Sequence, residues 1–137
     1  MEKLTMVGCD LHDRSMLLKY AGGSEKPKKR SFGTDSGARR KMVEMLKQYS
    51  EKAGATRIVF AYEASGLGFG LHDELEAQGI TCHVLAPSNM KRSPKQRRNK
   101  TEEKDAMDIL EVLRGHYLAG NKLPKVWIPD QQTRDDR

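Results

Sequence analysis

The chain has 137 residues, enough for one domain with a single hydrophobic core and too few for two. Apolar residues make up 36% of it, and 12 glycines complete a globular composition that excludes global disorder. With 25 Lys and Arg against 19 Asp and Glu, the net charge of +6 predicts a polyanionic partner, with nucleic acid as the first candidate.

Targeting signals and disulfides are not indicated. No run approaches the roughly 20 apolar residues that a membrane helix requires, and the amino terminus is unlike a secretory signal, so we expect a cytoplasmic protein with no membrane partner. Cys9 and Cys82 lie in apolar runs without metal-ligand spacing. This placement predicts two buried free thiols.

The first third of the chain is typical of three antiparallel strands. Apolar runs predict strands over residues 4–11 and 15–21, joined by a short polar turn. Gly22 and Gly23 predict the next turn. Residues 26–30 then form a basic loop, and a third strand follows over residues 30–34.

Helices and strands alternate through the middle of the chain. Apolar residues at helical spacing predict a helix over residues 38–52, which Gly54 ends. A continuous apolar run over residues 56–62 predicts a central strand that ends on Glu63. A turn at residues 65–66 leads into a second helix that runs to Gly79, and residues 80–86 form a last strand.

A basic segment and a third helix complete the pattern. Residues 91–100 hold six basic side chains and no acidic one, so this segment cannot build a core and is expected to contact phosphates. Its candidate nucleic-acid-binding residues are Lys91, Arg92, Lys95, Arg97, Arg98 and Lys100. Thr101 is the predicted cap of a helix whose apolar stripe reaches Tyr117.

The order of these elements predicts the fold class. Three strands, a helix, a strand, a helix and a strand make an α/β domain with two right-handed crossovers. We expect a five-stranded mixed sheet whose first three strands are antiparallel and whose fourth is parallel to the first. Helices should cover both faces.

Four carboxylates are placed where they can meet. Asp10 and Glu63 end the first and fourth predicted strands, and parallel neighbours bring such ends to one edge of a sheet. Asp105 and Asp108 share a face of the last helix. Taken singly, each carboxylate is better explained as a turn cap or a solvated surface charge. Taken together, they suit Mg²⁺ or Mn²⁺, which can assist attack on a phosphodiester.

The chain resembles the amino-terminal RuvC-like domain of the DEDD insertion-sequence transposases, the relatives of the Piv invertase that are described as bridge-RNA-guided recombinases. Five motifs carry the resemblance in order across residues 4–129: Val7-Gly8-Cys9-Asp10-Leu11-His12, Tyr62-Glu63-Ala64-Ser65-Gly66, Val84-Leu85-Ala86-Pro87-Ser88, Lys100-Thr101 with Lys104-Asp105-Ala106-Met107-Asp108, and Val126-Trp127-Ile128-Pro129.

The resemblance implies an RNase H-like fold and a catalytic, metal-binding tetrad of Asp10, Glu63, Asp105 and Asp108. It further implies a Mg²⁺-dependent (or Mn²⁺-dependent) DNA transposase or recombinase that cleaves and rejoins DNA under the guidance of a structured RNA. The full-length protein is expected to be a homo-oligomer. Cys9 departs from the family, where an aliphatic residue is usual.

The resemblance also bears on domain organisation. Residues 1–129 correspond to the RuvC-like domain, with the basic loop at 87–101 inside it, and the polar tail 130–137 corresponds to a link toward a carboxy-terminal transposase domain that carries a nucleophilic serine. The chain stops at Arg137. We therefore expect these 137 residues to bind nucleic acid and metal without exchanging strands.

Nucleotide-binding functions fit the sequence less well. Glycines 66, 68 and 70 have the wrong spacing for a dinucleotide loop, and the turn after Asp10 lacks the glycine of actin-like ATPases. His12 is the one histidine near the predicted site and a candidate phosphate contact. A non-catalytic nucleic-acid-binding platform and an autonomous Holliday-junction-type nuclease both stay open.

Overall fold

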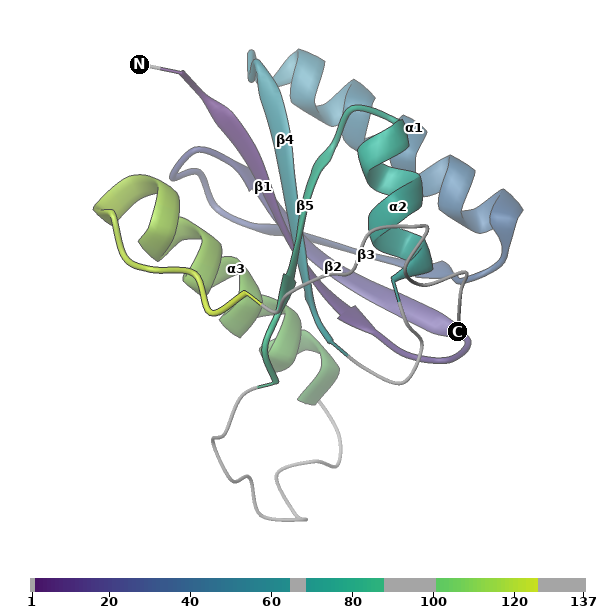
Figure 1. The fold of residues 1–137 in the computed structure, drawn as a ribbon. Helices are drawn as coiled ribbons and strands as arrows, with labels where there is room; N and C mark the ends of the chain where they lie inside the picture. The colour runs from purple at the N-terminus through teal and green to yellow at the C-terminus, as the bar shows by residue number, and fades with distance from the viewer. Residues whose placement is uncertain (1, 65–68, 88–100, 126–137) are drawn as a thin grey trace.

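The computed structural model describes residues 2–64, 69–87 and 101–125, with the side chains of residues 101 and 102 left out. Eight elements follow one another in this part of the chain (Figure 1). They are β1 (Leu4–Leu11), β2 (Ser15–Gly22), β3 (Lys28–Gly33), α1 (Ser36–Lys52), β4 (Arg57–Glu63), α2 (Gly70–Ala77), β5 (Thr81–Leu85) and α3 (Thr101–Ala119).

The strands form one mixed sheet in the order β3-β2-β1-β4-β5. β1 pairs antiparallel with β2, β2 pairs antiparallel with β3, and β1 pairs parallel with β4, which pairs parallel with β5. The predicted fold class is confirmed, because number, direction and neighbours of the strands agree. The arrangement is consistent with an RNase H-like fold.

Helices cover both faces of the sheet, as predicted (Figure 1). α1 and α2 pack on one face over a core that includes Leu18, Leu46 and Phe60. Of the described helices, α3 packs on the other face through Ile109, Leu110 and Leu113, against strand residues such as Met6, Val59 and Ala61. The central strand β4 is apolar on both sides because each side has a helical layer to bury it.

Local signals explain where the helices begin and end. The carboxylate of Asp35 accepts a hydrogen bond from the Ala38 amide and caps α1. Gly54 follows this helix with a φ of 72°, in the left-handed region where glycine is favoured. α3 runs from Thr101 to Ala119, and Gly120 follows with a φ of 76°. Thr101 is here the first described helical residue, and its predicted role as the cap is not tested because its side chain lies outside the described part of the chain.

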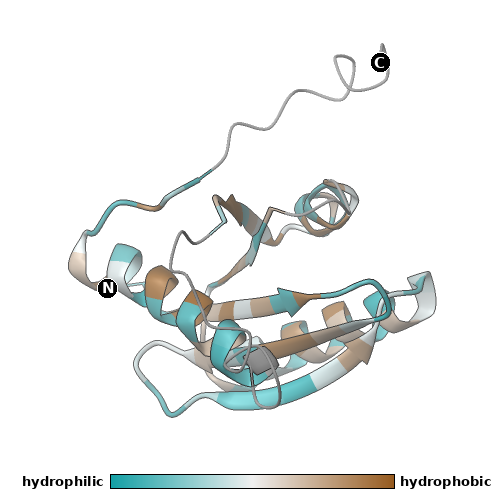
Figure 2. Ribbon diagram, turned by 90° about the horizontal axis from the view of Figure 1, so that it is seen from below, coloured by the Kyte–Doolittle hydropathy of each residue, from teal (hydrophilic) through white to brown (hydrophobic). Residues whose placement is uncertain are grey.

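The predicted basic loop at residues 26–30 is partly wrong, because β3 already begins at Lys28. The Lys28 ammonium lies over the ring of Tyr49, 5.5 Å from its centre, and the Arg30 guanidinium lies over that of Phe32, 5.2 Å from its centre. The first three residues of β3 are therefore basic and still belong to the strand. Figure 2 shows the resulting hydrophilic character of this edge.

Both cysteines are buried free thiols, as predicted. Burial raises the pKa of each thiol above its usual value. None of the described helices is long and apolar enough to cross a membrane. The predicted turn at 65–66, most of the basic segment and the tail lie outside the described residues.

Candidate active site

Asp10 and Glu63 lie on neighbouring strands. The parallel ladder between β1 and β4 pairs Cys9 with Tyr62, so Asp10 and Glu63 are the next residues along each strand. Neighbouring strands are about 4.8 Å apart, so the two carboxylates are close enough to bind one metal ion together. The prediction that Asp10 and Glu63 lie on adjacent strands is confirmed, and their role as metal ligands stays a prediction.

Both carboxylates belong to the face of the sheet that α3 covers. Cys9 and Tyr62 pack in the core beneath α1 and α2, whereas Ala61 packs beneath α3. Because successive side chains in a strand alternate between the two faces, Asp10 and Glu63 fall on the α3 side. At this end of the sheet β1 and β4 finish and α3 begins (Figure 1).

α3 supplies a third carboxylate. Its buried stripe consists of Ala106, Ile109, Leu110 and Leu113. Each helical residue advances by about 100°, which puts Asp105 about 90° to one side of that stripe and Asp108 about 150° away from it. Asp105 is therefore at the margin of the contact with the sheet, and Asp108 is turned further from it.

Asp10, Glu63 and Asp105 line one cavity of about 160 Å³. Its other walls are Cys9, Leu11, Ala64 and Ile109. The Asp10 side chain is 14% exposed, and the Oδ1 atom of Asp105 is buried. Asp108 is partly buried and is not among the residues that line this cavity. Three of the four predicted residues therefore share a cavity.

Hard oxygen donors of this kind match Mg²⁺ and Mn²⁺ in type. Within residues 2–64, 69–87 and 101–125, however, no three acidic, histidine or cysteine side chains are arranged so as to hold an ion. Holding a cation between the three carboxylates therefore requires their oxygen atoms to move closer together. The donor set fits the ion in chemistry, and its present arrangement is open.

Gly8 explains how α3 can lie so close to β1. A β-carbon built on Gly8 would lie 2.3 Å from the carbonyl oxygen of Ala106 and 2.5 Å from the amide nitrogen of Leu110. Both neighbours are helix backbone, which cannot turn aside as a side chain would. A glycine at this position lets the helix cross the strand two residues before Asp10 and keeps Asp105 near it.

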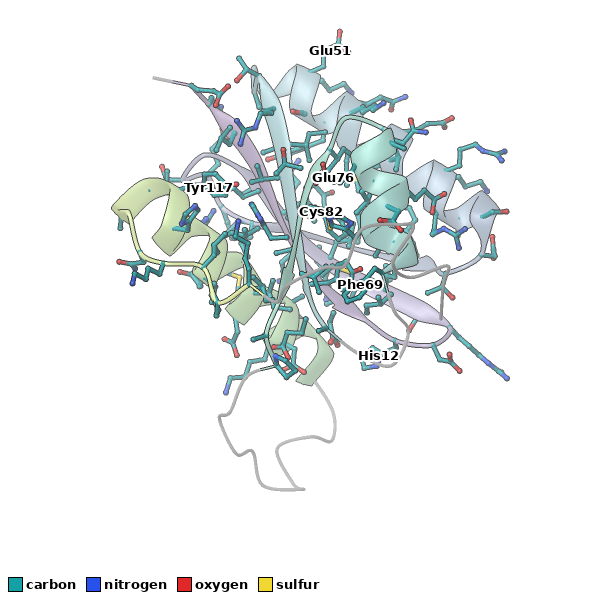
Figure 3. The ribbon with its side chains drawn as sticks, viewed as in Figure 1. His12, Glu51, Phe69, Glu76, Cys82 and Tyr117 are labelled. Atoms are coloured by element: carbon teal, nitrogen blue, oxygen red, sulfur yellow. The ribbon has the colours of Figure 1, made fainter. Side chains whose placement is uncertain are left out.

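His12 lies beside the first carboxylate, at the end of the sheet where β1 finishes (Figure 3). Its Nε2 atom is 2.7 Å from Oδ2 of Asp10, and its side chain is 47% exposed. The imidazole also lines a second cavity of about 340 Å³ on the α1 and α2 side. The sequence indicated that His12 is near the site; its suggested phosphate contact stays a prediction.

One contact at the site was not predicted from the sequence. Glu103, two residues before Asp105, accepts hydrogen bonds from Lys19 on β2 and Lys29 on β3. These bonds lower the pKa of Glu103 below its usual value. No sequence pattern links residues 19 and 103, which are 84 positions apart. Of the basic residues predicted to bind nucleic acid, all six lie outside the described part of the chain.

Comparison with known proteins gives two relatives. The chain is 32% identical over 98 residues to "Putative transposase y4qE" of Sinorhizobium fredii (strain NBRC 101917 / NGR234), covering 72% of this chain and 22% of that protein. It is 30% identical over 95 residues to "Putative transposase y4rJ" of the same organism, covering 67% and 24%. No family model matches. The sequence is transposase-like, and it spans less than a quarter of each relative.

Proposed function

We propose that this transposase-like chain is the RuvC-like, carboxylate-bearing part of a DEDD DNA transposase, acting on DNA with Mg²⁺ or Mn²⁺. The observation that carries the proposal is the shared cavity: Asp10, Glu63 and Asp105 come from two neighbouring strands and a helix and line the same space. The similarity to two proteins named as transposases supports the same reading.

In this proposal Asp10, Glu63 and Asp105 hold the ion, and Asp108 joins them from the next turn of α3. When bound, the cation would polarise a phosphoryl oxygen and lower the pKa of a water or hydroxyl. The chain's own contribution is to fix the carboxylates at the edge of a rigid sheet and to keep bulk water away from the partly buried Asp105 and Asp10.

DNA is the proposed substrate, and a structured guide RNA is a proposed second partner. The net charge of +6 supports a polyanionic partner of either kind. We assign the phosphate contacts to the basic segment from Lys91 to Lys100. Phosphate contacts of this type set affinity and position and carry no direct sequence information.

A thermal or urea unfolding series with Mn²⁺ tests the metal site. At a free Mn²⁺ concentration one hundred times its Kd, the ion should raise the free energy of unfolding by about 2.7 kcal/mol. A double variant, Asp10→Asn with Glu63→Gln, should lose this gain. The matched control is Glu44→Gln with Glu51→Gln, which removes two exposed carboxylates from α1 and should keep it.

Equal stabilisation of the parent and the Asp10/Glu63 variant would remove the proposed site. A non-catalytic nucleic-acid-binding platform is the second candidate, favoured by the open arrangement of the described carboxylates. In that case nucleic acid should bind with the same affinity to the parent and the double variant, whether or not Mn²⁺ is present.

A further inference from the structure

Glu103 is bound by two lysines that come from different strands. The Nζ atom of Lys19 is 2.7 Å from Oε1 of Glu103, and that of Lys29 is 3.2 Å from Oε2. Lys19 lies on β2 and Lys29 on β3, and the two are paired in the antiparallel register between these strands. The carboxylate of one helical residue therefore bridges two neighbouring positions of the sheet.

Lys19 is the firmer of the two anchors. Its side chain is only 14% exposed, whereas that of Lys29 is 52% exposed. It is paired with Gly8 across the β1–β2 ladder, directly beside the point where α3 crosses the sheet. A lysine largely withdrawn from water is costly unless its charge is paired, so Lys19 strongly favours a position of α3 that keeps Glu103 within reach.

Glu103 and Asp105 lie on opposite flanks of the helix. With about 100° per residue, Glu103 falls about 70° to one side of the buried stripe and Asp105 about 90° to the other. A rotation of α3 about its own axis that lifts Glu103 away from Lys19 must therefore move Asp105 relative to the cavity. The apolar stripe is held by non-directional packing, whereas the ion pair is directional.

The ion pair also acts at the end of α3 where the site is. The buried stripe begins at Ala106, and Glu103 is the first side chain of α3 that the structure describes. Apolar packing fixes the later turns, and the bonds from Lys19 and Lys29 fix the turn that precedes Asp105.

We propose that Lys19 is a positioning residue of the carboxylate cavity: by holding Glu103 it sets the rotation of α3 and keeps Asp105 beside Asp10 and Glu63. The consequence for metal binding rests on the proposed function. Lys29 assists from the exposed side.

Metal affinity separates positioning from a direct effect of charge. Removing a nearby cation should tighten Mn²⁺ binding, and removing a nearby anion should weaken it, if these groups act through their fields alone. Positioning predicts that Lys19→Met and Glu103→Gln both weaken Mn²⁺ binding, by about tenfold, as for other groups that orient metal ligands. Titration calorimetry of the 137-residue chain measures this.

A charge exchange provides the rescue. Lys19→Glu combined with Glu103→Lys rebuilds the ion pair in reverse and should recover most of the lost affinity. Lys28→Met is the matched control, since Lys28 lies over Tyr49 on the other face of the sheet. Tighter binding in Lys19→Met, unchanged binding in both single variants, or no recovery in the exchanged pair would overturn the proposal.

Hydrogen exchange gives a readout that needs no metal. Backbone amides of residues 105–107 should exchange several-fold faster in Lys19→Met and Glu103→Gln, while those of residues 110–113 change little and the exchanged pair restores the parent rates. If Lys19→Met folds poorly, Glu103→Gln still provides the test, because the Glu103 side chain is 43% exposed and its replacement disturbs the fold less.

The two measurements distinguish a failure of the proposed metal site from a failure of the positioning role of Lys19. If the parent binds no Mn²⁺ through Asp10 and Glu63, the proposed function is wrong and the exchange rates alone decide whether Lys19 positions α3. If the amides of residues 105–107 are unaffected in both variants, the positioning role is wrong whatever the metal affinity of the parent.

Discussion

Gly8 controls how closely α3 can approach the sheet, because any β-carbon there meets helix backbone at 2.3 Å. We predict that Gly8→Ala lowers the free energy of unfolding by about 1–3 kcal/mol, the usual cost of an overpacked core. The helix must lift or tilt, so Mn²⁺ affinity should fall as well. Urea unfolding and calorimetry measure the two effects.

Gly70→Ala is the comparison for this substitution. Gly70 begins α2, and a β-carbon there meets nothing within 4 Å. Alanine also has the higher helix propensity, so this variant should be as stable as the parent or slightly more so. A Gly8→Ala protein with the stability and metal affinity of the parent would contradict the close contact.

His83 makes the stability of the protein depend on pH. Its Nε2 atom is 2.6 Å from the hydroxyl oxygen of Tyr117, and burial lowers its pKa from 6.5 to about 4. The nearby charged or titratable groups that also act on it are Lys125, His116, Glu76 and Arg57. Below pH 6.5 the unfolded chain therefore binds a proton that the folded chain resists, and stability falls as the pH drops toward 4.

We predict a loss of about 1 kcal/mol between pH 7 and pH 5 that is specific to His83, allowing for its partial exposure. Urea midpoints of the parent and of His83→Gln at both pH values measure it, since all other titrating groups are common to the two proteins. Equal pH dependence in the two proteins would show that the imidazole is not withdrawn from water.

At the scale of elements, hydrophobic pattern was a sufficient guide to the strands and helices. The apolar run before Glu63 and the helical spacing before Gly54 identify β4 and α1 to within about two residues. β3 was harder, because its first three residues are Lys28, Lys29 and Arg30. Their place in a strand depends on pairing with β2 and on contacts with Tyr49 and Phe32.

The site residues that lie at the ends of strands could be predicted from the sequence, whereas those on α3 could be predicted only in part. Asp10 and Glu63 follow from strand direction alone, which is why they are found side by side. The placement of Asp105 and Asp108 depends on the rotation of α3, which an i,i+3 spacing leaves undetermined. The bond between Lys19 and Glu103 joins β2 to α3 and is visible only after the helix has been placed.

The basic segment from Lys91 to Lys100 should dominate the salt dependence of DNA binding. Replacing Arg92, Lys95, Arg97 and Arg98 by alanine should reduce the slope of log K against log salt by up to about 3.6, or about 0.9 for each phosphate that is no longer neutralised. Fluorescence anisotropy with duplex DNA over a salt series measures the slope.

The control for the segment removes the same charge from α1. Arg40, Lys41, Lys47 and Lys52 are all exposed, and replacing them by alanine also lowers the net charge by four. This control should shift affinity modestly and keep the slope close to that of the parent. If the two variants have equal slopes, net charge rather than the segment determines binding.

The 137 residues tested by themselves should bind nucleic acid without efficient cleavage. The region matched by this chain makes up 22% and 24% of the two relatives, and the resemblance implies an attacking serine elsewhere in such proteins. With Mg²⁺ and plasmid or branched DNA, we predict little or no nicking on agarose gels. Robust nicking that Asp10→Asn abolishes would identify an autonomous nuclease that uses activated water.

β3 lies at one edge of the described sheet, and this position has a consequence for contacts between copies of the chain. An edge strand offers its amides and carbonyls to any other strand, and this is how many sheets polymerise. Here two copies meeting edge to edge along this six-residue strand would bring Lys28, Lys29 and Arg30 of one copy close to the same three residues of the other. Their repulsion reaches about 10 Å in 0.1 M salt and about 3 Å in 1 M, so dilute buffer protects this edge from self-association and concentrated salt removes the protection.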